Sequence, residues 1–132
     1  MAALRFFARD CRGQALVELA MVIPILLMLL FGVIEFGRIF NAYLMVNQAS
    51  REGARIAAVG GSDEEITMTV ENFLAPLETQ KVKILIEPQE ERISGEGVSV
   101  TVEYQVDIIA PIISSIVPDP FNVSATTVMR VE

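Results

Sequence analysis

Hydrophobic and polar residues recur with different periods along this chain, and each period predicts a different kind of element. From Ala15 to Ile34, consecutive positions are almost all apolar and include a single charge, Glu18. At about 1.5 Å of rise per residue, a helix of this length spans a hydrocarbon core of roughly 30 Å. The pattern therefore predicts a membrane-spanning helix near the N-terminus.

The helical pattern continues beyond the apolar run as far as Val59. No proline interrupts residues 35–59, and small or apolar residues recur there at intervals of three and four, which places them on one face of a helix. These residues are Ala42, Val46, Ala49, Gly53 and Ile56. Because most of them are small, we expect another element to pack closely against this face. Gly60 and Gly61 are expected to end a helix that begins at about residue 15 and is about 68 Å long.

Residues 60–132 are predicted to form a short helix and a small sheet. Ser62 and Glu65 have the spacing of a capping box, and the apolar face expected for this helix consists of Ile66, Val70, Phe73, Leu74 and Leu77. From Lys81 onward the period changes to two, which predicts strands at about 82–86, 98–108 and 122–131. Ser94–Gly97 is expected to reverse the chain between the first two strands.

The predicted fold class is therefore α+β, with a long N-terminal membrane-spanning helix that continues into a small exterior domain. That domain is expected to hold a short helix and an antiparallel sheet of about three strands. The expected divisions are a basic leader (1–13), the transmembrane half of the long helix (14–34), its exterior half (35–59) and the exterior α+β domain (60–132).

Charge is distributed unevenly about the apolar run and predicts the orientation of the chain. The leader carries Arg5, Arg9 and Arg12 against Asp10, so it holds +2 of a formal net charge of −7, and the remaining residues hold −9. Basic residues flanking a span favour the cytoplasmic side. We therefore expect a cytoplasmic N-terminus and an acidic exterior domain outside the cytoplasm.

Composition argues against several classes of function. An acidic exterior domain is a poor match for nucleic acid, whose phosphates bind clustered lysine and arginine. The chain has no histidine and one cysteine, Cys11, so metal sites and Cys/His catalysis have almost no ligands or nucleophiles. We expect no catalytic residue, no metal, no cofactor and no small-molecule substrate, and no enzymatic activity.

The junction between the leader and the apolar run is the most informative motif. The leader ends in Gly13, Gln14 follows, and Glu18 stands five residues beyond the glycine inside the apolar run. A carboxylate near the end of a membrane segment is costly. Cleavage between Gly13 and Gln14 would create a positive amine, with which Glu18 of a neighbouring subunit can pair. The alternative is that Glu18 only reaches the cytoplasmic interface.

This junction resembles the class III signal of type IV pilin-like proteins. Four segments, at 12–18, 34–38, 49–55 and 123–130, together resemble the TadE-like minor pseudopilins of tight-adherence (Flp) pilus systems. The resemblance implies a pilin-like fold and cleavage after Gly13 by a prepilin peptidase. It also implies a place in the bacterial inner membrane, where other Tad pilin-like subunits and the assembly platform would be partners alongside the lipid bilayer.

Five charged residues on the exterior half of the long helix are candidate subunit contacts. They are Glu35, Arg38, Arg51, Glu52 and Arg55. For Glu35 and Arg38 the simpler interpretation is a surface ion pair at i, i+3, and for the other three it is a solvated helix face. A different function also fits the sequence, namely a single-pass anchored binding module of the cell envelope that does not polymerise.

Overall fold

A computed structural model describes residues 11–89, 92–111 and 113–132. Helix α1 (Cys11–Ala58) is followed by α2 (Asp63–Phe73), the short 3-10 turn η1 (Thr79–Lys81) and strand β1 (Val82–Glu87). Strand β2 (Gly97–Val106), the 3-10 turn η2 (Ile113–Ser115) and strand β3 (Phe121–Arg130) complete the chain. The predicted α+β fold, with a long helix, a short helix and a three-stranded antiparallel sheet, is confirmed.

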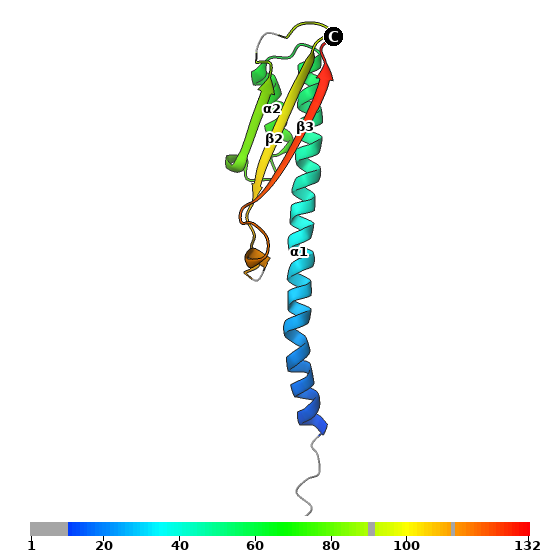
Figure 1. Cartoon of the computed structure of the whole chain (residues 1–132), viewed down its shortest axis with the longest axis vertical. Helices are drawn as coiled ribbons and strands as arrows, with labels where there is room; N and C mark the ends of the chain where they lie inside the picture. The colour runs from blue at the N-terminus through cyan, green and yellow to red at the C-terminus, as the bar shows by residue number, and fades with distance from the viewer. Residues whose placement is uncertain (1–10, 90–91, 112) are drawn as a thin grey trace, which may run out of the picture.

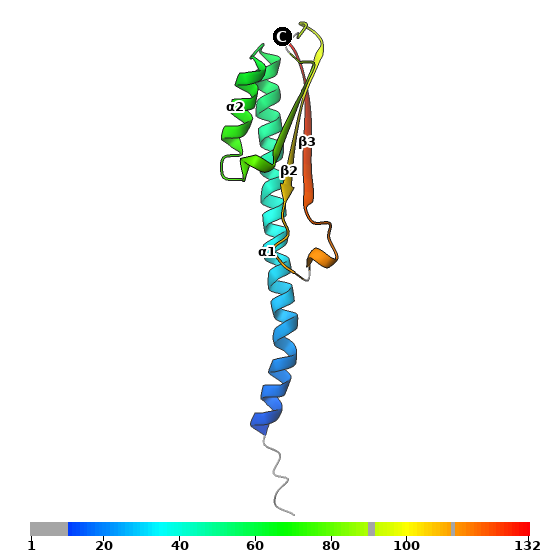
Figure 2. The same cartoon turned by 90° about the vertical axis from the view of Figure 1, so that its left-hand side faces the viewer.

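The exterior domain is built around the C-terminal half of α1, and the N-terminal half of that helix extends alone (Figures 1 and 2). The sheet has the order β1-β2-β3, with both neighbouring pairs antiparallel. Strands β2 and β3 pack against α1, and α2 packs beside the same half of α1. Among the described residues, the apolar half of α1 therefore has no packing partner.

Helix α1 differs from the prediction at its start and agrees with it at its end. Cys11, the first described residue, is already helical, whereas the predicted start was near residue 15, and Gly13 does not interrupt the helix. At the other end Gly60 has a positive φ of 83°, its N–H donates to Ala57, and the N–H of Gly61 donates to Ile56. These two bonds form a Schellman motif, which satisfies carbonyls left free by the end of the helix. The glycine pair is thus the predicted stop.

The helix face of α1 that carries the small residues, called here the small-residue stripe, lies at the centre of the core, as predicted. Ala42, Val46, Ala49 and Gly53 are buried, and Ile56 is half-buried beside them. An added Cβ on Gly53 would lie 2.8 Å from Val70 Cγ2 of α2 and 3.2 Å from Val100 Cγ1 of β2. Three elements therefore meet at a position where only glycine leaves enough space.

Helix α2 has the predicted capping box but a narrower apolar face. The N–H of Glu65 donates to the Ser62 hydroxyl, and the N–H of Ser62 donates to the Glu65 carboxylate. Ile66, Val70 and Leu74 are fully buried, whereas Phe73 is exposed, so its predicted place on the buried face is wrong. The helix ends at Phe73, and the i, i+4 series 66, 70, 74 is the row that meets α1 and the sheet.

The strands present one apolar face to α1 and one polar face to solvent. Val98, Val100, Val102, Tyr104 and Val106 of β2 are buried, as the alternation predicted. The connection from β1 to β2 is longer than a tight reversal. The predicted Ser94–Gly97 turn forms only its end, where the N–H of Glu96 donates to Ile93 and Gly95 has a positive φ of 91°.

Candidate functional site: the exposed helix and its charged positions

The N-terminal half of α1 exposes apolar side chains on every side. Residues 13–34 are exposed throughout, except for half-buried Gly32. The helix is long and apolar enough to cross a membrane, and none of its most apolar stretch is buried within the chain. A continuous apolar surface of this size is unfavourable in water. It indicates a single-pass membrane anchor.

The predicted processing motif lies at the beginning of this helix. Gly13 and Gln14 fall in its first turn, and an added Cβ on Gly13 would meet nothing within 4 Å. Glu18 lies four residues after Gln14, so the two side chains share a helix face about 6 Å apart along the axis. Glu18 is exposed, and so are its apolar neighbours Leu16, Val17 and Leu19. The leader's residues 1–10, with Arg5 and Arg9, lie outside the described residues.

Glu35 and Arg38 join the long helix to the end of the sheet. Arg38 Nη1 lies 2.7 Å from Glu35 Oε1 and also donates to the carbonyl oxygen of Asp107 at 3.1 Å. The second oxygen of Glu35 accepts the N–H of Ile109 at 3.3 Å. Glu35 is only 3% exposed. It is therefore a buried link within the chain rather than a bare surface pair, and its predicted role in subunit contacts stays a prediction.

The other three candidate contact residues lie on the outward face of α1. Arg51 is exposed, and Arg55 pairs with Glu52, with Nε at 3.1 Å from both carboxylate oxygens. The hydrogen bond from Arg55 lowers the pKa of Glu52, and the same bond raises the pKa of Arg55. An exposed pair of this kind contributes little to folding stability. Its predicted contact with another subunit also stays a prediction.

Two links between elements have no signal in the local sequence pattern. Ser50 is fully buried, and its hydroxyl donates to the carbonyl oxygen of Val100 at 2.8 Å and lies 2.9 Å from the Thr127 hydroxyl. Lys81 Nζ lies 2.5 Å from both Asp107 Oδ2 and Glu78 Oε2. Hydrogen bonds from Lys81 to these carboxylates raise its pKa. Lysine stays charged at neutral pH, so on the alkaline side the lysine's contribution is lost as the pH rises through its raised pKa.

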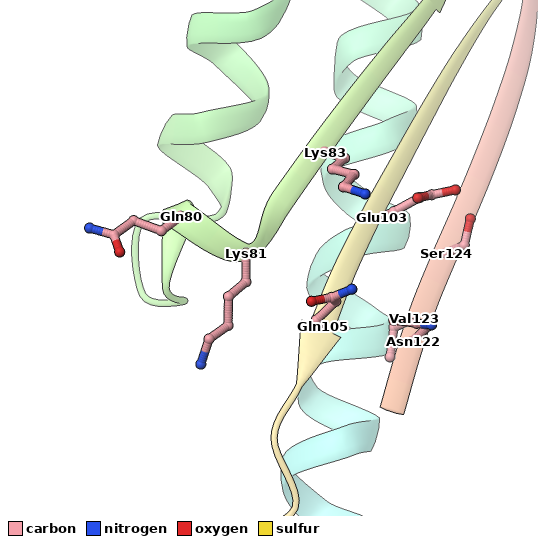
Figure 3. A pocket seen from close by; sticks show the side chains of 8 residues that line it. All are labelled: Gln80, Lys81, Lys83, Glu103, Gln105, Asn122, Val123 and Ser124. Carbon is pink, nitrogen blue, oxygen red and sulfur yellow. The ribbon is translucent and has the colours of Figure 1, made fainter. Parts of the chain in front are cut away.

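The outer face of the sheet carries a shallow polar hollow, shown in Figure 3. Lys83 of β1 and Glu103 of β2 are register partners there, with Ser124 of β3 opposite Glu103. Lys81 points away from these three side chains (Figure 3). Among the described residues, no group of three histidine, cysteine or acidic side chains is placed to hold a metal. The hollow is lined by hydrogen-bonding groups, among them the Ser124 hydroxyl and the Glu103 carboxylate.

Comparison with known proteins gives one match. A family model described as TadE-like protein matches residues 13–55. No curated protein and no solved structure matches the chain. The matched residues include the predicted processing motif, the exposed apolar span and the small-residue stripe as far as Gly53. The match supports a Tad pilus-associated role. It also confirms the resemblance predicted from the sequence: residues 13–55 of this chain are similar to TadE-like proteins.

Proposed function

We propose that this chain is a pseudopilin of a tight-adherence (Flp-type) pilus system, cleaved after Gly13 by a prepilin peptidase and active in pilus assembly. The observation that carries the proposal is Glu18, which is five residues beyond Gly13 and is the single charged residue, exposed, in the apolar stretch of α1 from Ala15 to Ile34. In lipid this charge is costly without a partner. After cleavage, the α-amine of Gln14 on a neighbouring helix supplies one, so pairing favours lateral association of cleaved subunits.

The same arrangement accounts for the partners we propose. The exposed span of α1 offers apolar side chains to lipid and to the helices of other Tad pilin-like subunits, and the inner-membrane assembly platform acts on the anchored protein. Among its described residues, the exterior domain holds no cluster of three histidine, cysteine or acidic side chains that could bind a metal. We therefore propose a structural role in adhesion pili, with no cofactor, no nucleic acid and no small-molecule substrate.

Processing is the direct test of this function. In cells that contain their prepilin peptidase, the mature protein should begin at Gln14, which N-terminal sequencing of the membrane fraction reports. Gly13→Ala should slow or block the cut, because the added methyl group lies at the scissile bond. Gly37→Ala is the matched control, since Gly37 is a glycine of the same helix whose added Cβ also meets nothing within 4 Å. It should leave cleavage unchanged.

An intact leader on the bulk of the membrane-bound protein would contradict the pseudopilin function. It would instead favour the anchored binding module that does not polymerise. If Gly13→Ala is cleaved as well as Gly37→Ala, the peptidase does not require a glycine at position 13.

Orientation follows from the arginines that precede the span. We propose that the N-terminus is cytoplasmic and that residues 60–132 lie in the periplasm, outside the inner membrane. A reporter active only in the periplasm should be active when fused after Glu132. A reporter active only in the cytoplasm should be silent at that position and active when fused ahead of Met1. The reverse pattern would overturn the assignment.

A further inference from the structure

We propose that the membrane-proximal end of the exterior domain is a second membrane contact. The structure that makes it is the base loop, defined as residues 107–111 and 113–120, between β2 and β3. We infer that this loop lies in the headgroup region of the bilayer that α1 crosses, with Ile109 and Ile116 in contact with lipid. The inference rests on the membrane anchor and not on the role in pilus assembly.

Two hydrogen bonds fix the height of the base loop along α1. The N–H of Ile109 donates to Glu35 at 3.3 Å, and Arg38 donates to the carbonyl oxygen of Asp107 at 3.1 Å. Glu35 is the residue directly after the apolar run that ends at Ile34. Headgroups extend about 5–7 Å beyond each side of the hydrocarbon core. The loop is therefore held at the level where a bilayer crossed by residues 15–34 has its surface.

The figures show the same placement. The base loop and η2 form the end of the exterior domain that points toward the N-terminal half of α1, and the C-terminus lies at the opposite end (Figures 1 and 2). No other part of the described sheet or of α2 extends as far in that direction. If α1 crosses a bilayer, this loop is the part of the domain that meets its surface.

The side chains at this level are unusually apolar for a surface. Ile109 is 70% exposed and Ile116 is 80% exposed, and Phe36, one residue beyond Glu35 on α1, is 71% exposed. Phe36 also stacks on exposed Phe40, with ring centroids 6.5 Å apart. Isolated apolar residues are ordinary on protein surfaces. Here they gather at one height, next to the exposed span, as aromatic and aliphatic residues do at a membrane interface.

The backbone of the base loop suits a surface with little water. Within its 3-10 turn, the N–H groups of Ile113 and Ser114 donate to Ala110, and those of Ile116 and Val117 donate to Ile113. The Ser114 hydroxyl donates to Pro111. Pro111, Pro118 and Pro120 have no N–H to satisfy. An unpaired backbone group is costly in an apolar environment. The internal bonds of this turn therefore lower the cost of placing it in the interface.

The charged groups of the base loop are both acidic, so they do not provide an attraction to the bilayer. Asp107 pairs with Lys81, and Asp119 Oδ1 accepts the N–H of Ile108 at 3.2 Å. Residues 107–120 include no lysine or arginine. Binding therefore comes from apolar burial and should be insensitive to salt and to anionic lipid, unlike a polybasic patch.

The test uses tryptophan as a depth probe, because the chain contains none. Full-length chains with Ile116→Trp or Ile109→Trp are reconstituted in phosphatidylcholine vesicles with and without lipids brominated along the acyl chain. Val128→Trp is the matched control, since Val128 is 66% exposed but lies near the far end of β3. Leu26→Trp, within the span, reports on the anchor itself.

Both base-loop probes should show blue-shifted emission, quenching by brominated lipid and protection from aqueous iodide, relative to Val128→Trp. Leu26→Trp should be quenched most strongly by brominated lipid. Base-loop probes as accessible to iodide as the Val128 probe, and unaffected by bromine, would overturn the inference while leaving the anchor in place.

Two other outcomes would also overturn the inference. Protection from iodide without bromine quenching, increasing with the protein-to-lipid ratio, would mean that a second copy of the chain covers the loop. Lack of bromine quenching at Leu26 would remove the anchor, and the base-loop contact with it. Neither result bears on cleavage after Gly13, so the proposed processing is judged separately.

Discussion

Gly53→Leu should destabilise the exterior domain by overpacking the small-residue stripe. The first added carbon would lie 2.8 Å from Val70 Cγ2 and 3.2 Å from Val100 Cγ1, so both α2 and β2 must move. Overpacking of a filled core costs about 1–3 kcal/mol of unfolding free energy, and occasionally more. Thermal or denaturant unfolding of the full chain in detergent, followed by circular dichroism, measures this loss.

Gly37→Leu is the matched control for that substitution. Gly37 lies in the same helix, but its added Cβ meets nothing within 4 Å. Removal of a helical glycine stabilises a helix by roughly 0.5–1 kcal/mol, so Gly37→Leu should be neutral or slightly stabilising. Equal unfolding midpoints for Gly53→Leu and the parent chain would mean that the contact of α1 with α2 and the sheet is loose. The core described above would then be incorrect.

Glu18→Gln should abolish most piliation without affecting insertion or processing. Glutamine keeps the size of the side chain and removes the charge, so the variant should enter the membrane at least as well as the parent. It should still be cut after Gly13. The neighbour's Gln14 amine would then lose its partner in a low-dielectric setting, which is strongly penalised. Loss of about 1.4 kcal/mol per contact already weakens association about tenfold, so pili per cell should fall at least that far.

Three measurements from one strain separate the possible causes of this loss. They are the amount of protein in the membrane, its N-terminal residue, and the number of pili per cell. Glu64→Gln, which removes an exposed acid from α2, is the control and should leave all three unchanged. Normal piliation by Glu18→Gln would show that Glu18 is a tolerated interfacial acid. The charge-pairing explanation would then be abandoned.

Local signals in the sequence were sufficient for the elements and for the anchor. The long apolar run, the change of period from 3.6 to two and the capping box at Ser62 and Glu65 each depend on residues a few positions apart. The same holds for the Gly60–Gly61 stop and for the processing motif at Gly13 and Glu18. Such short-range patterns determine which face of an element is apolar, and they identified the residues that the family model matches.

Tertiary structure decided which of those residues meet. Glu35 has a partner 74 positions away, and Ser50 has partners at 50 and 77 positions. The spacing of α1 places both residues on the same helix face as the buried Ala42 and Val46. Their polar partners, however, are supplied by segments that fold back on the helix from far along the chain. Phe73 is the opposite case, since it fits the apolar spacing of α2 but lies beyond the area that α1 and the sheet cover.

The sequence by itself therefore determined the anchor, the elements and the candidate cleavage site, because each is encoded by neighbours along the chain. Only the tertiary structure showed that Glu35 and Arg38 hold the base loop at the end of the span and that Ile109 and Ile116 remain exposed there. The physical reason is that hydrophobic patterning specifies that a residue can be buried. Which residues are buried depends on the finite area that packed elements cover, and that is set by contacts far apart in the chain.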